Sequence, residues 1–150
     1  MSPIEVTLAS DLAEPLSLLE TSLRDGEPLP EAFVEKLREH VRSGNMDVLA
    51  ARSEGRTLGV AVLAYRPNIA AGALFASIED LYVSPEARRQ GAGTALLAAA
   101  NARCRACKIS YLEVQVEDEM ARSFYTSLGY EPEETVSVLS RSQPIDVPGE

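Results

Sequence analysis

The stretch that decides the fold is residues 73–106, which read ALFASIEDLYVSPEARRQGAGTALLAAANARCRA. Its first part predicts a β-strand from Ala73 to Val83, and its alanine- and leucine-rich end predicts a helix from about Gly91 to Ala106. The residues between the two elements form a loop of a size that can hold a phosphate group. This strand, loop and helix are therefore the most informative part of the sequence.

The loop ends in Arg88-Arg89-Gln90-Gly91-Ala92-Gly93, where the N–H groups of a helix start are free and the helix dipole favours an anion. Gly91 and Gly93 have no Cβ, so the main chain can approach phosphate oxygens closely, and the two arginines add positive charge. The segment predicts a pyrophosphate site. A helix start that merely uses glycine, with solvated arginines, remains the alternative.

Two better-known phosphate motifs are excluded by inspection. A P-loop requires Gly-Lys followed by Ser or Thr, whereas Gly93 is followed by Thr94 and Ala95. A dinucleotide fingerprint requires a third glycine at residue 96, where Leu96 stands, and a tighter turn after the strand.

Upstream of this unit the sequence predicts a strand, two helices and a hairpin. Ile4 to Leu8 alternates apolar and polar residues, and an Asp11-x-x-Glu14 capping box then opens a helix. A second helix follows and ends at Gly44, and two β-like runs then extend over Met46 to Ser53 and Thr57 to Tyr65. The expected buried positions are Leu12, Leu16, Leu19 and Leu23 in the first helix and Phe33, Leu37 and Val41 in the second.

Downstream, Ile109 to Val116 predicts a strand and Asp118 to Leu128 a helix that Gly129 caps. The expected core face of this last helix is Met120, Phe124 and Leu128. Thr135 to Leu139 has the composition of a final strand, and the tail from about residue 142 is expected to be frayed. Without a repeat or a linker, we expect one mixed α/β domain over residues 1–150.

The composition limits the classes of partner. With 150 residues, 45% hydrophobic and 25% charged, the chain has the make-up of one globular domain. A formal net charge of −9 argues against nucleic acid, which needs a basic face, and favours a cationic small molecule. The sequence shows neither a membrane-spanning run nor a signal peptide, so we expect no membrane partner and a cytoplasmic location.

The cysteines and the histidine give no metal site. Cys104 and Cys107 are three residues apart in a helical pattern, and His40 lies in another element, so we expect no disulfide and no zinc. We expect reduced, packed thiols, because buried cysteine behaves as a small hydrophobe. His40 is expected to be an ordinary helix residue.

The order of the motifs resembles the GCN5-related N-acetyltransferase (GNAT) family. Val83 and Arg88-x-x-Gly91-x-Gly93 are followed about thirty residues later by Ser123-Phe124-Tyr125-x-x-x-Gly129-Tyr130. The resemblance implies a single domain with a mixed, mainly antiparallel sheet flanked by helices. It also implies acetyl-CoA as cosubstrate and no metal, and it makes a homodimer plausible. The implied coenzyme contacts are backbone at Leu81 and Val83 for the pantetheine arm, and Arg88, Arg89, Gln90, Gly91, Ala92, Gly93 and Thr94 for the pyrophosphate.

Within the family, the segments around residues 78–83 and 112–129 look like those of aminoglycoside 3-N-acetyltransferases and diamine acetyltransferases. Both branches act on polycations, which implies a small cationic amine as acceptor. One departure is Asp118, where many members have asparagine; aspartate also caps a helix, so we expect a plain N-cap there.

Acetylation of an amine needs a base. An amine with a pKa near 10 is only about 0.1% unprotonated at pH 7, which costs about 4 kcal/mol. Glu79 and Asp80 are adjacent on a strand, so regular alternation points their side chains to opposite faces. The resemblance makes Glu79 the base, directly or through water, and Asp80 can hold the ammonium group if a β-bulge turns both toward one cleft. Solvent-facing sheet residues are the alternative.

The resemblance also gives Tyr125 the role of general acid that protonates the departing thiolate. A packed tyrosine is the alternative. For the protein as a whole, an amino-acid or protein N-terminal acetyltransferase and a non-catalytic acyl-CoA-binding regulatory module remain open. Residues 26–30 and 68–75 are expected to line the acceptor site, although neither carries a diagnostic motif.

Overall fold

The structure, a computed structural model, describes residues 2–145. The chain forms two compact units, one up to Gln115 and one from Val116, and each is described by itself. Residues 146–150, which include part of the tail predicted to be frayed, lie outside the described residues.

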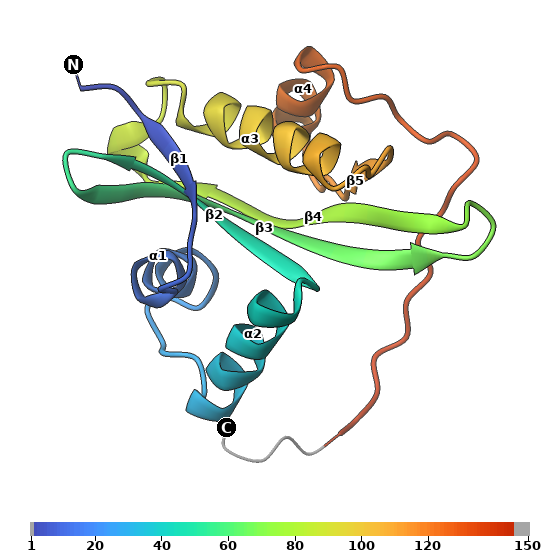
Figure 1. Cartoon of the computed structure of the whole chain (residues 1–150), viewed down its shortest axis with the longest axis horizontal. Coiled ribbons are helices and arrows are strands. Elements are labelled where there is room, and N and C mark those ends of the chain that lie inside the picture. Colours follow the sequence, from blue (N-terminus) through green and yellow to red (C-terminus); the bar gives the residue numbers. More distant parts are fainter. Residues whose placement is uncertain (1, 146–150) are drawn as a thin grey trace. The chain divides into compact units, whose positions relative to one another are not determined.

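The first unit is built on one five-stranded sheet (Figure 1). Its strands are β1 (Glu5–Leu8), β2 (Met46–Ser53), β3 (Arg56–Asn68), β4 (Ala73–Val83) and β5 (Leu112–Val114). They lie in chain order, and all neighbours are antiparallel except β4 and β5, which are parallel. The mixed, mainly antiparallel sheet is therefore confirmed.

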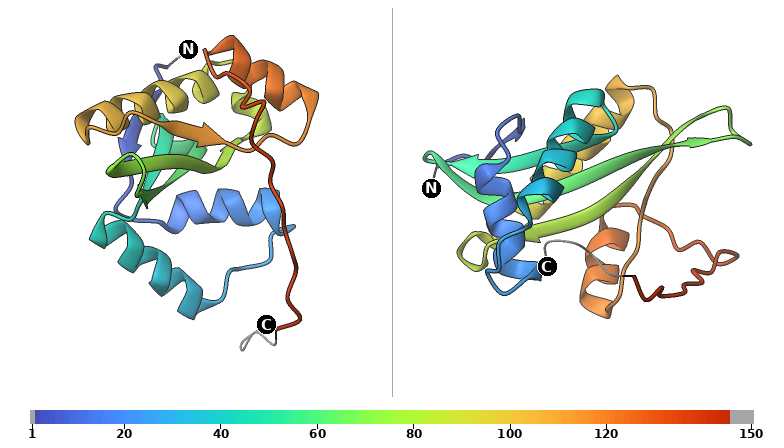
Figure 2. Two further views of the ribbon diagram at one scale, coloured as in Figure 1. Left: turned by 90° about the vertical axis from the view of Figure 1, so that its right-hand side faces the viewer. Right: turned by 90° about the horizontal axis from the view of Figure 1, so that it is seen from below.

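Helices cover both faces of this sheet (Figures 1 and 2). The helices α1 (Ala13–Leu23) and α2 (Glu31–Ser43) lie on one face, and α3 (Ala92–Ala106) lies on the other. A single 3₁₀ turn, η1 (Pro85–Ala87), joins β4 to the start of α3. Because β4 and β5 are parallel, a long crossover is needed between them, and α3 supplies it.

The core has a layer on each face, because side chains alternate along the strands. On the α1 face, leucines of the helix pack against Val48, Val60 and Val62. On the α3 face, Leu63 of β3 and Leu96 of α3 have no exposed surface. The predicted stripe of the first helix is confirmed at Leu12, Leu16 and Leu19, but Leu23 is 64% exposed.

The local signals of turns and helix ends are largely confirmed. Glu54 and Gly55 both have positive φ, as the two central residues of a type I′ hairpin require, and they join β2 to β3. Gly44 ends α2 in the left-handed conformation. The capping box is only half formed. Asp11 Oδ1 accepts from Ala13 N–H, but Glu14 accepts instead from Thr57 and Arg52, because the β2–β3 hairpin brings those donors to the helix.

The cysteines are only partly as expected. Both are free thiols; Cys104 is buried, whereas Cys107 is exposed. Cys107 is the residue that caps α3 at its C-terminal end, so it lies past the last turn that packs on the sheet. His40 lies within α2, as expected. Between residues 2 and 145, no helix is long and apolar enough to span a membrane.

The second unit contains α4 (Glu119–Ser127). Asp118 caps it as predicted, with its side chain accepting from Ala121 N–H at 2.8 Å. The expected core face is wrong at Met120, which is 83% exposed; Phe124 and Leu128 are partly buried, and Tyr125 is the buried residue. The buried face is centred one helical position further along, on Tyr125, and apolar spacing alone does not choose between the two positions.

No strand forms at Thr135 to Leu139 in the part of the chain that the structure describes. Val136 and Leu139 are 65% and 93% exposed. Valine-rich composition favours a strand only when another strand accepts its hydrogen bonds, and none pairs with this segment. The predicted final strand is therefore wrong.

Candidate active site

A β-bulge in β4 changes the direction of the two candidate carboxylates. Asp80 pairs with Val62 of β3, but the next pair on that strand joins Leu63 to Ile78, so Glu79 is an extra residue without a partner. An extra residue interrupts the alternation of side chains along a strand. The prediction of opposite faces is therefore wrong, and the bulged arrangement is the one found: Glu79 and Asp80 line the same cavity.

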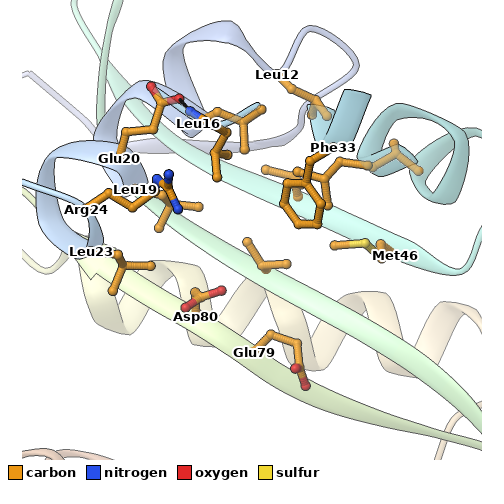
Figure 3. Close-up of a pocket in the computed structure, with 15 residues that line it drawn as sticks. Leu12, Leu16, Leu19, Glu20, Leu23, Arg24, Phe33, Met46, Glu79 and Asp80 are labelled. Carbon is orange, nitrogen blue, oxygen red and sulfur yellow. Dashed lines mark hydrogen bonds between the residues drawn. The ribbon is translucent and has the colours of Figure 1, made fainter. Parts of the chain in front are cut away.

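This cavity has a volume of about 470 Å³ and lies between α1, α2 and the sheet (Figure 3). Most of its wall is hydrocarbon. The apolar side chains are Leu12, Leu16, Leu19, Leu23, Leu29, Phe33, Leu37, Val41, Met46, Val48 and Val62, and the charged ones are Glu20, Arg24, Glu79 and Asp80. In Figure 3 the leucines of α1, Phe33 of α2 and the two carboxylates of β4 surround one space.

The cavity exists because α2 does not pack closely on the sheet. Its stripe of Phe33, Leu37 and Val41 was expected to be buried, yet α2 has no buried residue and Phe33 is 46% exposed. Leu37 and Val41 pack against the core but stay partly buried, and hydrogen bonds hold the two ends of the helix. Before it, Leu29 N–H donates to the Glu20 carboxylate at 2.6 Å, and after it, Asn45 C=O accepts from Tyr65 N–H at 3.0 Å. The apolar stripe therefore faces the cavity.

Asp80 has the less usual environment of the two carboxylates. Burial raises its pKa, and the negative charge of Glu79 adds to the rise. Among the described residues no donor hydrogen-bonds to Asp80 and no cation pairs with it. Glu79 is exposed, and its Oε2 accepts from the Ser77 hydroxyl at 2.5 Å. Two like charges thus share one wall, and one of them is half-buried.

The other two charged residues of the wall serve the loop between α1 and α2. Glu20 accepts from Leu29 N–H, as described above. Arg24 Nε donates to the Glu27 carbonyl at 3.1 Å, and its guanidinium lies 3.9 Å from the Glu27 carboxylate. Neither is therefore a candidate for the chemistry.

The start of α3 has the features of an anion site. Gly91 precedes the helix with φ of +85°, and the first helical bond runs from Ala95 N–H to the Gly91 carbonyl. The N–H groups of Ala92, Gly93 and Thr94 come before that bond, so they are available to an anion. A Cβ on Gly91 would meet nothing within 4 Å, which leaves open space in front of the helix.

The loop before α3 is held by its own side chains. Arg88 Nε donates to the Val83 carbonyl at 3.1 Å, and its guanidinium lies 5.8 Å from the centre of the Tyr82 ring. Gln90 Nε2 donates to the Glu86 carbonyl at 2.7 Å. Arg89 is exposed with φ of +74°. Arg88 and Gln90 thus shape the loop, and Arg89 adds charge at its surface.

An open edge of strand β4 connects the cavity with the start of α3. The strand β5 pairs only with Ala76, Ser77 and Ile78, whereas β4 continues to Val83. Within the described residues, the β5-facing edge of β4 beyond Ile78 has no strand partner. Leu81 and Val83, the predicted pantetheine contacts, lie on this part of the strand. The predicted strand from Ile109 to Val116 is correspondingly shorter than expected.

Tyr125 lies in the second unit. Burial raises its pKa to about 12, and the neighbouring Tyr130 adds to the rise. Its ring makes edge-to-face contacts with Phe124 and Tyr130, each at 5.3 Å between ring centres. The structure therefore joins Glu79 and Asp80 in one cavity, and the role of Tyr125 stays a prediction.

The two segments predicted to line the acceptor site contribute to this cavity only in part. Leu29, from the predicted segment 26–30, lines it. Residues 68–75 do not, because β3 and β4 form a long hairpin whose tip projects away from the helices (Figure 1). The leucines of α1 were expected only as core residues. The helical spacing of these leucines does not indicate that part of the apolar face of α1 faces a cavity.

Comparisons with known proteins give the class. The sequence profile of the acetyltransferase (GNAT) family matches residues 12–130. The chain therefore belongs to the acetyltransferase (GNAT) family, whose members are enzymes that transfer acetyl groups. The predicted resemblance is confirmed. No curated protein matches the chain.

Solved structures share the fold. An acetyltransferase from Trypanosoma brucei is 24% identical with a TM-score of 0.76, over 93% of this chain and 100% of that one. An aminoglycoside acetyltransferase from an uncultured soil metagenomic sample, in complex with sisomicin, is 24% identical with a TM-score of 0.79, over 94% and 95%. An aminoglycoside antibiotic 6′-N-acetyltransferase from Acinetobacter baumannii is 17% identical with a TM-score of 0.75, over 94% and 99%.

Proposed function

We propose that this chain transfers the acetyl group of acetyl-CoA to the primary amine of a small cationic acceptor. One observation carries the proposal: the bulge at Glu79 turns two adjacent carboxylates into one cavity, where Asp80 has no donor and no cation among the described residues. A withdrawn carboxylate without a partner is unfavourable, and an ammonium group is the partner that relieves it.

The residues at the start of α3 suit the coenzyme. Three main-chain N–H groups precede the first helical bond, and the space in front of Gly91 is open. These groups would hold the pyrophosphate, with Arg88 and Arg89 adding charge, and the open edge at Leu81 and Val83 would take the pantetheine arm. When bound, acetyl-CoA supplies a thioester carbonyl as electrophile.

The two carboxylates then have separate roles. Asp80 holds the ammonium group of the acceptor, and Glu79 accepts its proton, directly or through one water. Loss of that proton frees the nitrogen lone pair, which forms the new C–N bond as the C–S bond breaks. Glu79 is the better base of the two because it is exposed, so it can return the proton to solvent after each turnover.

Tyr125 is the proposed donor to the departing sulfur. With a pKa of about 12 it stays protonated at neutral pH, so its hydroxyl is always available to donate. Full transfer to a thiolate with a pKa near 8.5 is uphill by about 5 kcal/mol. We therefore propose that a hydrogen bond from the hydroxyl stabilises the sulfur, with water completing the proton transfer.

The experiment that tests the function is a thiol-release assay. Purified protein is given acetyl-CoA and a panel of primary amines that includes an aminoglycoside, a polyamine, an amino acid and simple alkylamines. The proposal expects thiol release that depends on the amine. Coenzyme binding without release by any amine would instead support a non-catalytic acyl-CoA-binding module.

Replacement of Tyr125 by phenylalanine tests the leaving-group role. The change keeps the ring contacts and removes only the hydroxyl, so turnover should fall by about 10²- to 10⁴-fold with coenzyme affinity unchanged. The loss should shrink with an acyl donor whose thiol is more acidic, because such a thiolate needs no donor. Wild-type turnover in Tyr125→Phe would make Tyr125 a packing residue.

A further inference from the structure

The wall of the cavity is too apolar for a ligand with polar groups along its length. Eleven of the fifteen residues that line it are leucine, valine, methionine or phenylalanine. Of the four charged residues, Glu20 and Arg24 bind the loop between α1 and α2. Only Glu79 and Asp80 are left to recognise a ligand, and they are adjacent, so they form one polar spot.

This distribution does not match a polycation. A polyamine or an aminoglycoside carries ammonium or hydroxyl groups at regular intervals, and each needs its own partner when it is buried. Against leucine side chains such a group has none, which lowers the affinity about tenfold or more for each group. A molecule with a single amine and an apolar body matches both the carboxylate pair and the hydrocarbon part of the wall.

We propose, building on the acetyltransferase function above, that the acceptor is an amphipathic primary monoamine. Its ammonium group binds at Glu79 and Asp80, and an alkyl or arylalkyl body fills the cavity. A space of about 470 Å³ holds about 10 to 15 non-hydrogen atoms at liquid-like volumes. This size corresponds to a phenylalkylamine or a medium-chain alkylamine.

The stripe on α2 supports this ligand independently of the carboxylates. Phe33, Leu37 and Val41 lie on the face toward the cavity, while Lys36 and Glu39 lie among the exposed residues of the same helix. A helix with such a stripe is stable only when something apolar covers it. Leu37 and Val41 pack against the core but are only partly buried, and Phe33 is 46% exposed, so an apolar ligand body would complete the contact that α2 lacks.

Calorimetric titration tests the proposal without relying on catalysis. The intact protein, saturated with coenzyme A, is titrated with the n-alkylamines from butylamine to decylamine, with octanol, and with spermidine. Affinity should rise about fourfold for each methylene until the cavity is full, because each one leaves water. Octylamine should bind at least tenfold more tightly than octanol, which lacks the ammonium group, and than spermidine.

Three results would overturn the proposal. They are affinity that does not change with chain length, spermidine or an aminoglycoside binding more tightly than octylamine, and a peptide with an N-terminal leucine binding more tightly than any free amine. The last would make the cavity a site for a protein N-terminus.

Variants locate the binding in this cavity. Phe33→Ser should weaken octylamine binding about tenfold and flatten the dependence on chain length. Ala32→Ser, on the neighbouring exposed position of α2, should bind like the wild type. Asp80→Asn should weaken octylamine binding but not octanol binding. Circular dichroism checks the folding of each variant, and an unchanged chain-length dependence in folded Phe33→Ser contradicts the proposal.

Turnover separates this inference from the function on which it rests. Octylamine that binds as expected, with no thiol released from acetyl-CoA by it or by any other amine of the panel, would refute the proposed function and leave the amine site in place. Thiol release with polycations and none with octylamine would support the function and refute the apolar acceptor.

Discussion

Asp47 on β2 and Asp80 on β4 are both withdrawn from solvent, but only Asp47 has partners. Asp47 is 6% exposed, and its Oδ2 accepts from Arg103 Nε at 2.7 Å and from the Tyr65 hydroxyl. Burial raises the pKa of Tyr65, and its hydrogen bond with Asp47 adds to the rise. The hydrogen bond with Asp47 also raises the pKa of Arg103. Asp80 has only Glu79, of the same sign.

The difference separates a charge with a structural role from one that is proposed to bind a ligand. Asp47 joins three elements, because Tyr65 belongs to β3 and Arg103 to α3. Its charge is already satisfied, so it fixes the helix on the sheet and has nothing left for chemistry. Asp80 faces a cavity and is satisfied by nothing in the described residues, which is the state expected of a binding group.

The largest effect should come from Asp47→Ala. The change leaves the Tyr65 hydroxyl and the Arg103 guanidinium without their acceptor, which should lower the free energy of unfolding by about 3 kcal/mol. Arg103 is 36% exposed, and its contact with water keeps the loss at the lower end of the range for buried pairs. Urea denaturation measures it. The matched control, Asp80→Ala, should cost less than about 0.5 kcal/mol, and equal losses would remove the contrast.

The second effect concerns activity. Asp80→Asn removes the charge that is proposed to hold the ammonium group, so KM for the amine should rise about 10- to 100-fold with a smaller change in kcat. Glu79→Gln removes the proposed base, so it should lower kcat instead. Steady-state kinetics of both variants check this split. The same response in both would mean that the carboxylates act as one group.

Local patterns predicted the strand–loop–helix unit closely. The strand Ala73–Val83 was predicted to the residue, and α3 begins one residue after the predicted start. Both follow from composition and from glycine at a helix start, which are properties of neighbouring residues. The candidate carboxylates and the anion-binding loop could be named for the same reason, together with the family resemblance.

The features that the sequence did not predict depend on contacts between residues far apart in the chain. The bulge at Glu79 is a matter of register between β3 and β4, and alternation alone predicted opposite faces. The spacing of Phe33, Leu37 and Val41 identified an apolar face but not that a cavity lies in front of it. The group of Asp47, Tyr65 and Arg103 was missed because its members lie far apart in the chain and each has an ordinary local context.

Glycines give the third test of structural against functional roles. Gly91 and Gly55 both have positive φ, at +85° and +75°, and a Cβ on either would meet nothing within 4 Å. Gly91→Val and Gly55→Val should each lose about 1 to 2 kcal/mol of stability, because side chains disfavour this backbone conformation. Only Gly91→Val should also weaken coenzyme binding, by about tenfold, since its side chain would stand where the phosphate approaches. Calorimetry with coenzyme A measures this difference.

A folded Gly91→Val protein with unchanged coenzyme affinity would sink the assignment of the loop at the start of α3. Loss of coenzyme affinity in Gly55→Val, whose neighbour Arg56 pairs with Glu86 of η1, would show that the assay reports the stability of this region rather than phosphate contact.

The smallest effect is the dependence of stability on pH. Burial and Glu79 raise the pKa of Asp80 above its usual value of 3.8, so the fold favours the protonated carboxyl. Below pH 3.8 that preference contributes fully to stability, and it is lost as pH rises through the raised value. Asp80→Asn has no such loss. Urea midpoints should therefore coincide at low pH and diverge in favour of the variant as pH rises, by less than about 1 kcal/mol because Asp80 is partly solvated.

A saturating amine should reverse the order, since its ammonium group favours the charged carboxylate. If the wild type were the more stable protein at neutral pH without an amine, Asp80 would have a partner within the fold, as Asp47 does.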